Sequence, residues 1–187
     1  MKYLIAGLGN IGEEYANTRH NVGFMMLDRL AAEENIVFAD KRYGFVAEYK
    51  YKGRILTLLK PSTYMNLSGR AINYWLQKEK IEIDKLLVLV DDLALPFGSI
   101  RLKGKGGDGG HNGLRNIIDV LGTKEYARLR FGIGNEFSEG RQYDYVLGKW
   151  TEEEEKLLPD RLKITTDIIR SYVTAGLELT MTSFNNK

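Results

Sequence analysis

Cysteine is absent from the 187 residues of this chain, and long apolar runs are absent as well. Without cysteine the chain has no disulfide, no thiolate metal site and no cysteine nucleophile, which is compatible with a reducing compartment. No apolar run approaches the roughly 20 residues of a membrane span. The apolar start at residues 3–6 ends at Gly7, too early for the core of a signal peptide. We therefore expect a soluble, unprocessed protein of the cytoplasm that does not associate with membranes.

The chain also has little net charge, because 27 Lys and Arg residues face 25 Asp and Glu residues and leave a formal charge of +2. Composition alone therefore does not indicate a nucleic-acid-binding protein. Residues 99–130 are an exception, with seven basic against three acidic residues and a local charge of +4. The seven basic residues are Arg101, Lys103, Lys105, Arg115, Lys124, Arg128 and Arg130. Any affinity for phosphate is expected to be local to this segment.

Hydrophobic periodicity divides the chain into alternating strands and helices. Five stretches have the pattern of strands: residues 2–7, residues 45–51 and 54–59 around a Lys52-Gly53 turn, residues 85–90 ending in Asp91-Asp92, and residues 129–134. Three stretches have the pattern of helices: residues 22–31 with Asn21 as their cap, residues 68–80, and residues 113–121 closed by Gly122. The pattern predicts an α/β fold with a mixed central β-sheet flanked by helices.

The last part of the chain is expected to be helical. Thr151 and Glu154 have the spacing of a capping box, so the acidic run at residues 152–155 is explained by a helix start. Pro159 predicts a break between two C-terminal helices. No repeat or linker marks an internal boundary, and residues 1–187 are expected to form a single domain.

Only two histidines occur, and each is followed directly by asparagine: His20-Asn21 and His111-Asn112. Both lie in polar or glycine-rich segments where a loop is expected. An imidazole titrates near pH 6.5, so a neighbouring carboxylate can make it a base at neutral pH. This combination indicates a hydrolytic site; the alternative is that each histidine only ties down a loop through hydrogen bonds.

Gly7, Gly9 and Gly12 satisfy the G-x-G-x-x-G pattern of dinucleotide-binding proteins directly after a strand. The polar segment that follows, with two glutamates at residues 13–14, would repel a pyrophosphate. No acidic residue ends a second strand about 20 residues later, and Asp40 lies 28 residues beyond Gly12. An NAD-dependent oxidoreductase therefore remains a minor alternative.

Residues 104–110 contain five glycines in seven residues. They lack the closing Gly-Lys-Ser/Thr of a Walker A loop, so nucleoside triphosphate hydrolysis has little support. The segment is expected to be a mobile lid or a platform for an acceptor strand, with a plain flexible connection as the alternative.

Four motifs occur in order at residues 7–23, 60–69, 91–98 and 109–114, followed by residues 128–134 and 146–149. Together they closely resemble bacterial peptidyl-tRNA hydrolases, over essentially the whole chain. The resemblance implies a monomeric esterase without metal or cofactor. Its expected reaction cleaves the bond between a peptide and the 3′ end of tRNA, recycling tRNA from stalled or aborted translation.

The resemblance also implies roles for individual residues. His20 is expected to be the general base and Asp91 to orient its ring. Asparagine amides are expected to hold water, the peptide backbone or the ester carbonyl, with Asn10 closest to catalysis; these are Asn10, Asn66 and Asn112. Tyr15, Tyr64 and Met65 are expected to line the substrate cleft. His111 is expected to support or gate the site.

Arg101, Lys103 and Arg130 are expected, again by resemblance, to bind tRNA phosphates, including the 5′ terminal phosphate. The alternatives are a solvated basic face or a non-catalytic RNA-binding module. Three positions depart from the family pattern: Ile11 in place of a proline, Ala94 in place of an acidic residue, and Asp108 within the glycine loop. Ile11 is expected to loosen the loop that carries Asn10, and Asp108 to weaken the attraction of phosphate.

Overall fold

Seven strands form one mixed sheet in the computed structural model, which describes residues 1–186. The strands are β1 (Lys2–Gly7), β2 (Ala39–Lys41), β3 (Gly44–Tyr51), β4 (Arg54–Pro61), β5 (Leu86–Asp92), β6 (Ile100–Lys103) and β7 (Ala127–Gly132). Their order across the sheet is β2-β3-β4-β1-β5-β7-β6. The central pairs β4-β1, β1-β5 and β5-β7 are parallel, whereas the pairs towards both edges are antiparallel. The predicted mixed sheet is confirmed.

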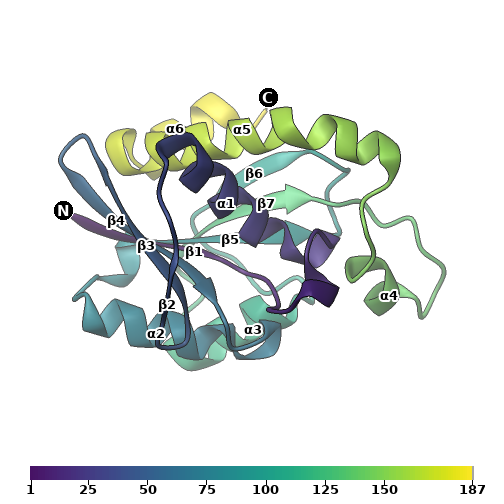
Figure 1. The fold of residues 1–187 in the computed structure, drawn as a ribbon, viewed down its shortest axis with the longest axis horizontal. Helices are drawn as coiled ribbons and strands as arrows, with labels where there is room; N and C mark the ends of the chain where they lie inside the picture. Colours follow the sequence, from purple (N-terminus) through teal and green to yellow (C-terminus); the bar gives the residue numbers. More distant parts are fainter. Residues whose placement is uncertain (187) are drawn as a thin grey trace.

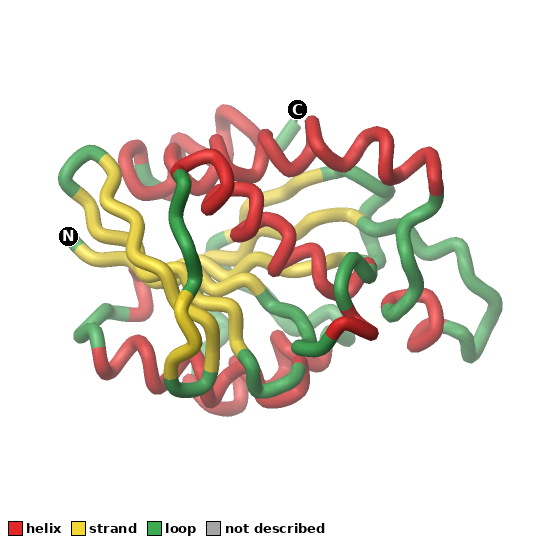
Figure 2. Tube along the Cα trace, in the orientation of Figure 1, coloured by secondary structure: helices red, strands yellow, loops and turns green. Residues whose placement is uncertain are grey.

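Helices cover both faces of this sheet (Figures 1 and 2). They are α1 (Val22–Glu34), α2 (Ser68–Lys78), α3 (Asn112–Leu121), α4 (Gln142–Val146), α5 (Glu152–Ala175) and α6 (Leu177–Phe184). Helices α1, α5 and α6 lie on one face, and α2 and α3 on the other. Short α4 contacts the 3-10 turn at Arg19–Asn21. Among residues 1–186 no helix is both long enough and apolar enough to cross a membrane.

Each face of the sheet has its own hydrophobic core. In β1, Tyr3 and Ile5 join the core under α1 and α5, whereas Leu4 and Ala6 join the core under α2 and α3. Both cores follow from the period of two in a strand, whose successive side chains point to opposite faces. A central strand buried on both faces therefore reads as an unbroken apolar run, as residues 2–7 do.

The hairpin between β3 and β4 turns at Lys52 and Gly53, as predicted. Both residues have a positive φ, of 46° and 78°. Two successive left-handed residues give the turn whose twist matches that of the flanking strands, and glycine adopts this conformation without strain.

The edge strands β2 and β6 were not predicted, and β7 lies two residues earlier than the expected 129–134. β2 and β6 have only three and four residues, too few for a sequence period to be recognised. Asn185 covers β6: its Oδ1 accepts from the Leu102 N–H (2.7 Å) and its Nδ2 donates to the Leu102 carbonyl (2.9 Å). This pairing occupies backbone groups that would otherwise leave the edge open.

The prediction of two C-terminal helices around Pro159 is wrong, because α5 runs continuously through this proline. The next helix begins only after Gly176, whose φ is 91°. Proline removes one hydrogen bond to the carbonyl of Glu155, but that residue is exposed and water can replace the bond. The buried side chains of Leu158 and Leu162, on either side of the proline, hold the helix against the core.

The glycines of the G-x-G-x-x-G pattern bring the end of β1 against α1. A Cβ at Gly7 would lie 2.2 Å from the Gly23 carbonyl oxygen, and one at Gly9 would lie 2.8 Å from the Phe24 ring. Two 3-10 turns, Glu13–Tyr15 and Arg19–Asn21, separate this loop from α1, so the strand does not run directly into its helix as in a dinucleotide fold. The pattern thus has a packing explanation.

The Gly7→Ala substitution is expected to lower the free energy of unfolding by about 2 kcal/mol, because its new methyl group meets backbone atoms of α1 that cannot turn aside. Urea denaturation followed by circular dichroism measures the change. Gly107→Ala is the matched control, since nothing lies within 4 Å of its Cβ position, and it should stay within about 0.5 kcal/mol of wild type. Equal stability of both variants would refute the packing explanation.

Candidate active site

The carboxyl ends of β1, β4 and β5 open into a cleft of about 740 Å³. Eleven of the twelve residues expected in the site line it: Asn10, Tyr15, His20, Tyr64, Met65, Asn66, Asp91, Lys103, His111, Asn112 and Arg130. Arg101 is the exception and lies outside the lining. The cleft is therefore at the rim where parallel strands deliver polar side chains, and it joins segments far apart in the sequence.

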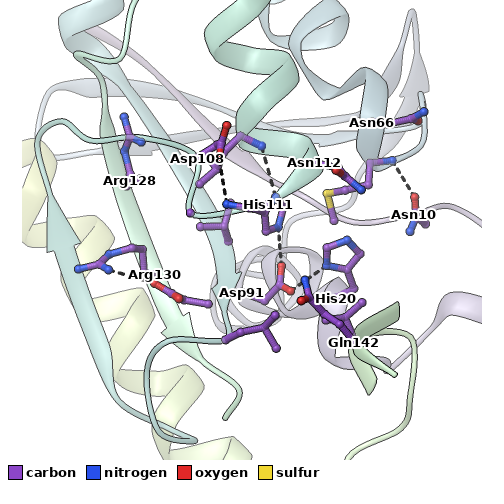
Figure 3. A pocket seen from close by; sticks show the side chains of 18 of the residues that line it. Asn10, His20, Asn66, Asp91, Asp108, His111, Asn112, Arg128, Arg130 and Gln142 are labelled. Carbon is purple, nitrogen blue, oxygen red and sulfur yellow. Dashed lines mark hydrogen bonds and ion pairs between the residues drawn. The ribbon is translucent and has the colours of Figure 1, made fainter. Parts of the chain in front are cut away.

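Asp91, at the end of β5, lies between the two histidines (Figure 3). His20 Nδ1 is 2.7 Å from Asp91 Oδ2, and His111 Nε2 is 2.8 Å from Asp91 Oδ1. The carboxylate is only 4% exposed, so each of its oxygens depends on one imidazole N–H. Burial of an ionised carboxylate is tolerated when both oxygens are paired in this way.

The tautomer of His111 follows from its other neighbours. Its Nδ1 accepts the backbone N–H groups of Gly113 (3.1 Å) and Leu114 (3.3 Å) and thereby caps the N-terminus of α3. An Nδ1 that accepts has no proton, so the proton of the neutral ring lies on Nε2 and is donated to Asp91. His111 is thus held between the helix and the carboxylate.

The charge of Asp91 changes the protonation of its surroundings. Burial raises the pKa of Asp91, but the two histidines outweigh burial and hold that pKa well below its usual range. Burial lowers the pKa of His20, yet the charge and hydrogen bond of Asp91 outweigh it, so the pKa of His20 lies above its ordinary value of 6.5. Asp91 therefore stays ionised and makes His20 more basic.

Asn21 holds the loop that carries Asn10. Its Oδ1 accepts from the Asn10 N–H and its Nδ2 donates to the Asn10 carbonyl, both at 2.8 Å. Asn21 is the N-cap residue of α1, as predicted, but its side chain makes no hydrogen bond to the helix. Asn10 Oδ1 accepts from the Met65 N–H (2.7 Å), which leaves its Nδ2 without a partner among residues 1–186. This amide can donate into the cleft.

Arg19 fixes the other side of His20 to the C-terminal part of the chain. Its guanidinium donates to the Tyr145 carbonyl (3.1 Å) and pairs with Glu154 (3.3 Å), and its own N–H donates to the Gly148 carbonyl (3.0 Å). A Cβ at Gly148 would lie 2.9 Å from the guanidinium. The motif at residues 146–149 is therefore explained by its contact with Arg19.

Arg128 anchors the glycine-rich loop. This buried guanidinium donates to the carbonyls of Gly106 (2.8 Å), Gly107 (3.1 Å), Lys124 (2.7 Å) and Tyr126. Residues 106–110 form part of the cleft wall, and one end of the loop is tied to β7. Because Arg128 is 1% exposed and engaged with carbonyls, the local charge of +4 overstates the charge available to a ligand.

The basic side chains of β6 and β7 lie on one face of the sheet. The antiparallel register places Arg101 opposite Arg130 and Lys103 opposite Arg128, and directly opposed residues point to the same side. Arg130 donates to Asp92 Oδ2 (3.0 Å), and Asp92 Oδ1 accepts from the Ala94 N–H. Directly opposed like charges destabilise a sheet, and among these four side chains only Arg130 pairs with a carboxylate within residues 1–186.

Several lining residues were not predicted. Gln142, Tyr143, Val146 and Leu147, in and directly after α4, line the cleft more than a hundred residues away from His20 in the sequence. Gln142 lies beside His20 in Figure 3. Only the motif at residues 146–149 indicated that this region matters, because a short polar helix has no period that reveals its neighbours.

Three side chains of the site could in principle hold a metal, because ligand atoms of His20, Asp91 and His111 lie within 4.8 Å of one another. The hydrogen bonds argue for a different use. His111 Nε2 carries a proton in this arrangement, and a protonated nitrogen cannot ligate. The expectation of a metal-free site stays a prediction.

The fold and the site together define an α/β enzyme with the features of a hydrolase: a buried carboxylate holds an imidazole at the edge of a polar cleft. A family model described as Peptidyl-tRNA hydrolase matches residues 4–187. The chain therefore belongs to the peptidyl-tRNA hydrolase family, as its motifs predicted, and is an enzyme that acts on ester bonds.

Individual relatives agree with this assignment. The peptidyl-tRNA hydrolase of Phocaeicola vulgatus is 60% identical over 187 residues, and that of Cytophaga hutchinsonii is 54% identical over 187 residues; both matches cover 100% of each chain. The crystal structure of peptidyl-tRNA hydrolase from Acinetobacter baumannii has a TM-score of 0.92 at 36% identity, covering 98% of this chain and 94% of that chain. The fold and the reaction class are thus those of the family.

Asp91→Asn is expected to move the pKa of His20 from above 6.5 to below it, since burial remains while the stabilising charge is lost. Proton NMR of the His20 ring during a pH titration measures this, with the resonance assigned from its loss in His20→Gln. Asp92→Asn is the matched control, because Asp92 bonds Arg130 and not His20. An unchanged pKa in Asp91→Asn would show that Asp91 does not set the basicity of the ring.

Proposed function

We propose that His20 is the general base in hydrolysis of the ester between a peptide and the 3′ end of tRNA. One observation carries the proposal: His20 Nδ1 is engaged by Asp91 at 2.7 Å, while Nε2 forms no hydrogen bond within residues 1–186. A carboxylate that accepts a hydrogen bond from Nδ1–H fixes the proton on Nδ1 and leaves the lone pair of Nε2 free for a water molecule. An ester requires only an activated water, without a covalent nucleophile.

The proposed reaction has two proton transfers. His20 Nε2 accepts a proton from water as the water oxygen attacks the ester carbonyl, which gives a tetrahedral oxyanion. The oxyanion collapses, the bond to the ribose oxygen breaks, and the imidazolium of His20 returns the proton to that oxygen. Asp91 stays ionised throughout and stabilises the transient imidazolium. The products are a free peptide and tRNA with an unmodified 3′ end.

The asparagines are proposed to hold the reacting groups. The unpaired Nδ2 of Asn10 can donate to the developing oxyanion or position the water. Asn66 and Asn112 are exposed on the cleft wall and can bind the peptide backbone, because an amide both donates and accepts. Tyr15, Tyr64 and Met65 form the apolar part of the wall, and His111 supports Asp91.

The basic face of β6 and β7 is proposed to bind tRNA phosphates, including the 5′ phosphate, through Arg101, Lys103 and Arg130. Its opposed like charges support this, because a bound anion would relieve their repulsion. We further propose that the enzyme works as a monomer in the cytoplasm and recycles tRNA from stalled or aborted translation. A non-catalytic RNA-binding module is the remaining alternative, and it would use the basic face without His20.

His20→Gln is expected to lower kcat/KM about 10²- to 10⁴-fold on N-acyl-aminoacyl-tRNA, because the water loses its base. The wild-type rate should rise with pH through the His20 pKa, since only the neutral ring accepts a proton. Release of deacylated tRNA, with chelator present, measures both effects, and aminoacyl-tRNA with a free amine should be a poor substrate. Full activity in His20→Gln would exclude it as the base.

Lys103→Glu is expected to weaken tRNA binding and to reduce the slope of log Kd against log salt by about one, because one phosphate contact is lost. Filter binding over a salt series measures the slope. Lys50→Glu is the matched control, an equal charge reversal on the exposed surface of β3. Identical slopes for both variants would remove Lys103 from the phosphate site.

A further inference from the structure

Two arginines and two tyrosines form a cationic, aromatic surface outside the cleft, which we call the Arg–Tyr shelf: Arg42, Tyr43, Arg70 and Tyr74. The Arg42 guanidinium carbon lies 5.1 Å from the Tyr43 ring centre and 5.5 Å from that of Tyr74. Arg70 lies 5.8 Å from the Tyr43 ring, and the two tyrosine rings meet edge to face at 5.4 Å. The arginines are exposed and the tyrosines half-buried.

The backbone of the shelf is fixed by hydrogen bonds. Trp75 Nε1 donates to the Arg42 carbonyl, and the Ser62 N–H donates to the Tyr43 carbonyl, both at 2.8 Å. Tyr43 has a φ of 63°, a left-handed conformation that is unfavourable for a tyrosine and is held here by these neighbours. The turn between β2 and β3 is therefore locked onto α2, with the Arg42 guanidinium close to the rings of Tyr43 and Tyr74.

The two positive charges of the shelf are not neutralised. Within residues 1–186 neither Arg42 nor Arg70 forms an ion pair with a carboxylate, whereas Arg19, Arg130 and Arg170 all do. Arg42 Nη2 donates to the Tyr43 hydroxyl (3.4 Å), and the other guanidinium N–H groups of Arg42 and Arg70 form no hydrogen bond within residues 1–186. These N–H groups can bind an anion, and the tyrosine rings beside them can receive another planar group. The shelf thus has the chemistry to bind carboxylates and aromatic side chains.

The shelf is continuous with one wall of the cleft. Ser62, which bonds to Tyr43, is two residues before Tyr64, a lining residue that is 50% exposed. Helix α2, which carries Arg70 and Tyr74, begins directly after the turn at Met65–Leu67. In Figure 3 this wall, marked by Asn10 and Asn66, lies across the catalytic pair from Arg128 and Arg130.

We propose that the Arg–Tyr shelf binds the peptide part of the substrate and favours peptides with acidic or aromatic residues upstream of the ester. This inference rests on the proposed function, in which the tRNA phosphates occupy the wall of Arg130. With the ester at His20 and the RNA on that side, the acyl chain leaves past Asn66 and Tyr64, towards Arg70. At ~3.4 Å per extended residue, the second to sixth residues upstream of the ester lie roughly 7 to 20 Å from it, and these are the positions proposed to reach the shelf.

The test compares N-acetylated peptidyl-tRNAs that share one tRNA and one esterified residue and carry either glutamate or lysine at these upstream positions. For wild type we expect kcat/KM to be about fivefold higher with glutamate, through a lower KM, and the difference to shrink at high salt. The double variant Arg42→Glu/Arg70→Glu should reverse the preference. Arg42→Gln/Arg70→Gln, which cannot repel, should abolish it.

Two controls separate this inference from the proposed function. Lys50→Glu/Lys52→Glu reverses two charges at the far end of β3, roughly 25 Å from Tyr43 at ~3.3 Å per residue, and should keep the wild-type preference. N-acetyl-aminoacyl-tRNA, too short to reach the shelf, should be cleaved equally by every shelf variant, whereas its cleavage depends on His20 if the proposed function holds.

Three results would overturn the inference. The wild-type enzyme could cleave both peptides equally, or both shelf variants could retain the preference. An equal loss on all substrates, including the short one, together with weaker binding of deacylated tRNA, would assign the shelf to RNA. Thermal unfolding of each variant identifies a folding defect. If the double glutamate variant is destabilised, the substrate preference of Arg42→Gln/Arg70→Gln tests the inference.

Discussion

The site depends on one buried carboxylate shared by two imidazoles. Asp91 could not stay ionised at 4% exposure without the N–H groups of His20 and His111, because desolvation alone would favour its neutral form. The two rings contact the carboxylate through different nitrogens, Nδ1 of His20 and Nε2 of His111, and the remaining nitrogen of each ring has a different environment. That of His111 is occupied by the N-terminus of α3, and that of His20 is open to the cleft. This asymmetry makes one histidine a support and leaves the other able to act as a base.

His20 owes its position to the residues on both sides of it. Arg19 ties the segment to the carbonyls of Tyr145 and Gly148 and to Glu154, while Asn21 ties it to the Asn10 loop. Three successive residues thus connect the C-terminal region, the carboxylate and the first loop. Glu154 also closes the capping box of α5, so one side chain contributes both to the start of this helix and, through Arg19, to the position of His20.

The local sequence pattern was sufficient to predict those elements whose structure depends mainly on their own residues. The strand at 2–7, the Lys52-Gly53 turn, the Gly122 end of α3 and the capping box at Thr151 all followed from period or backbone preference. The roles of Asn21 and Arg128 did not, because a side chain that bonds distant backbone leaves no trace in spacing. The helix break predicted at Pro159 does not occur for a related reason: the burial of Leu158 and Leu162 outweighs one missing hydrogen bond. The sequence motifs predicted which residues form the site, but only the fold gives the distances between them.

On the basic face of β6 and β7, the backbone of the glycine-rich loop compensates the charge of a buried arginine. Arg128 is buried without a carboxylate, and the carbonyls of Gly106 and Gly107 replace one. Glycine allows those carbonyls to approach, so the loop supplies the negative ends of peptide dipoles to a charge that would otherwise be uncompensated. Arg128 is thereby withdrawn from the surface, and Arg130 is partly neutralised by Asp92. Lys103 and Arg101 remain the cations of this face that have no ion pair within residues 1–186, so an anion bound there should depend on them most strongly.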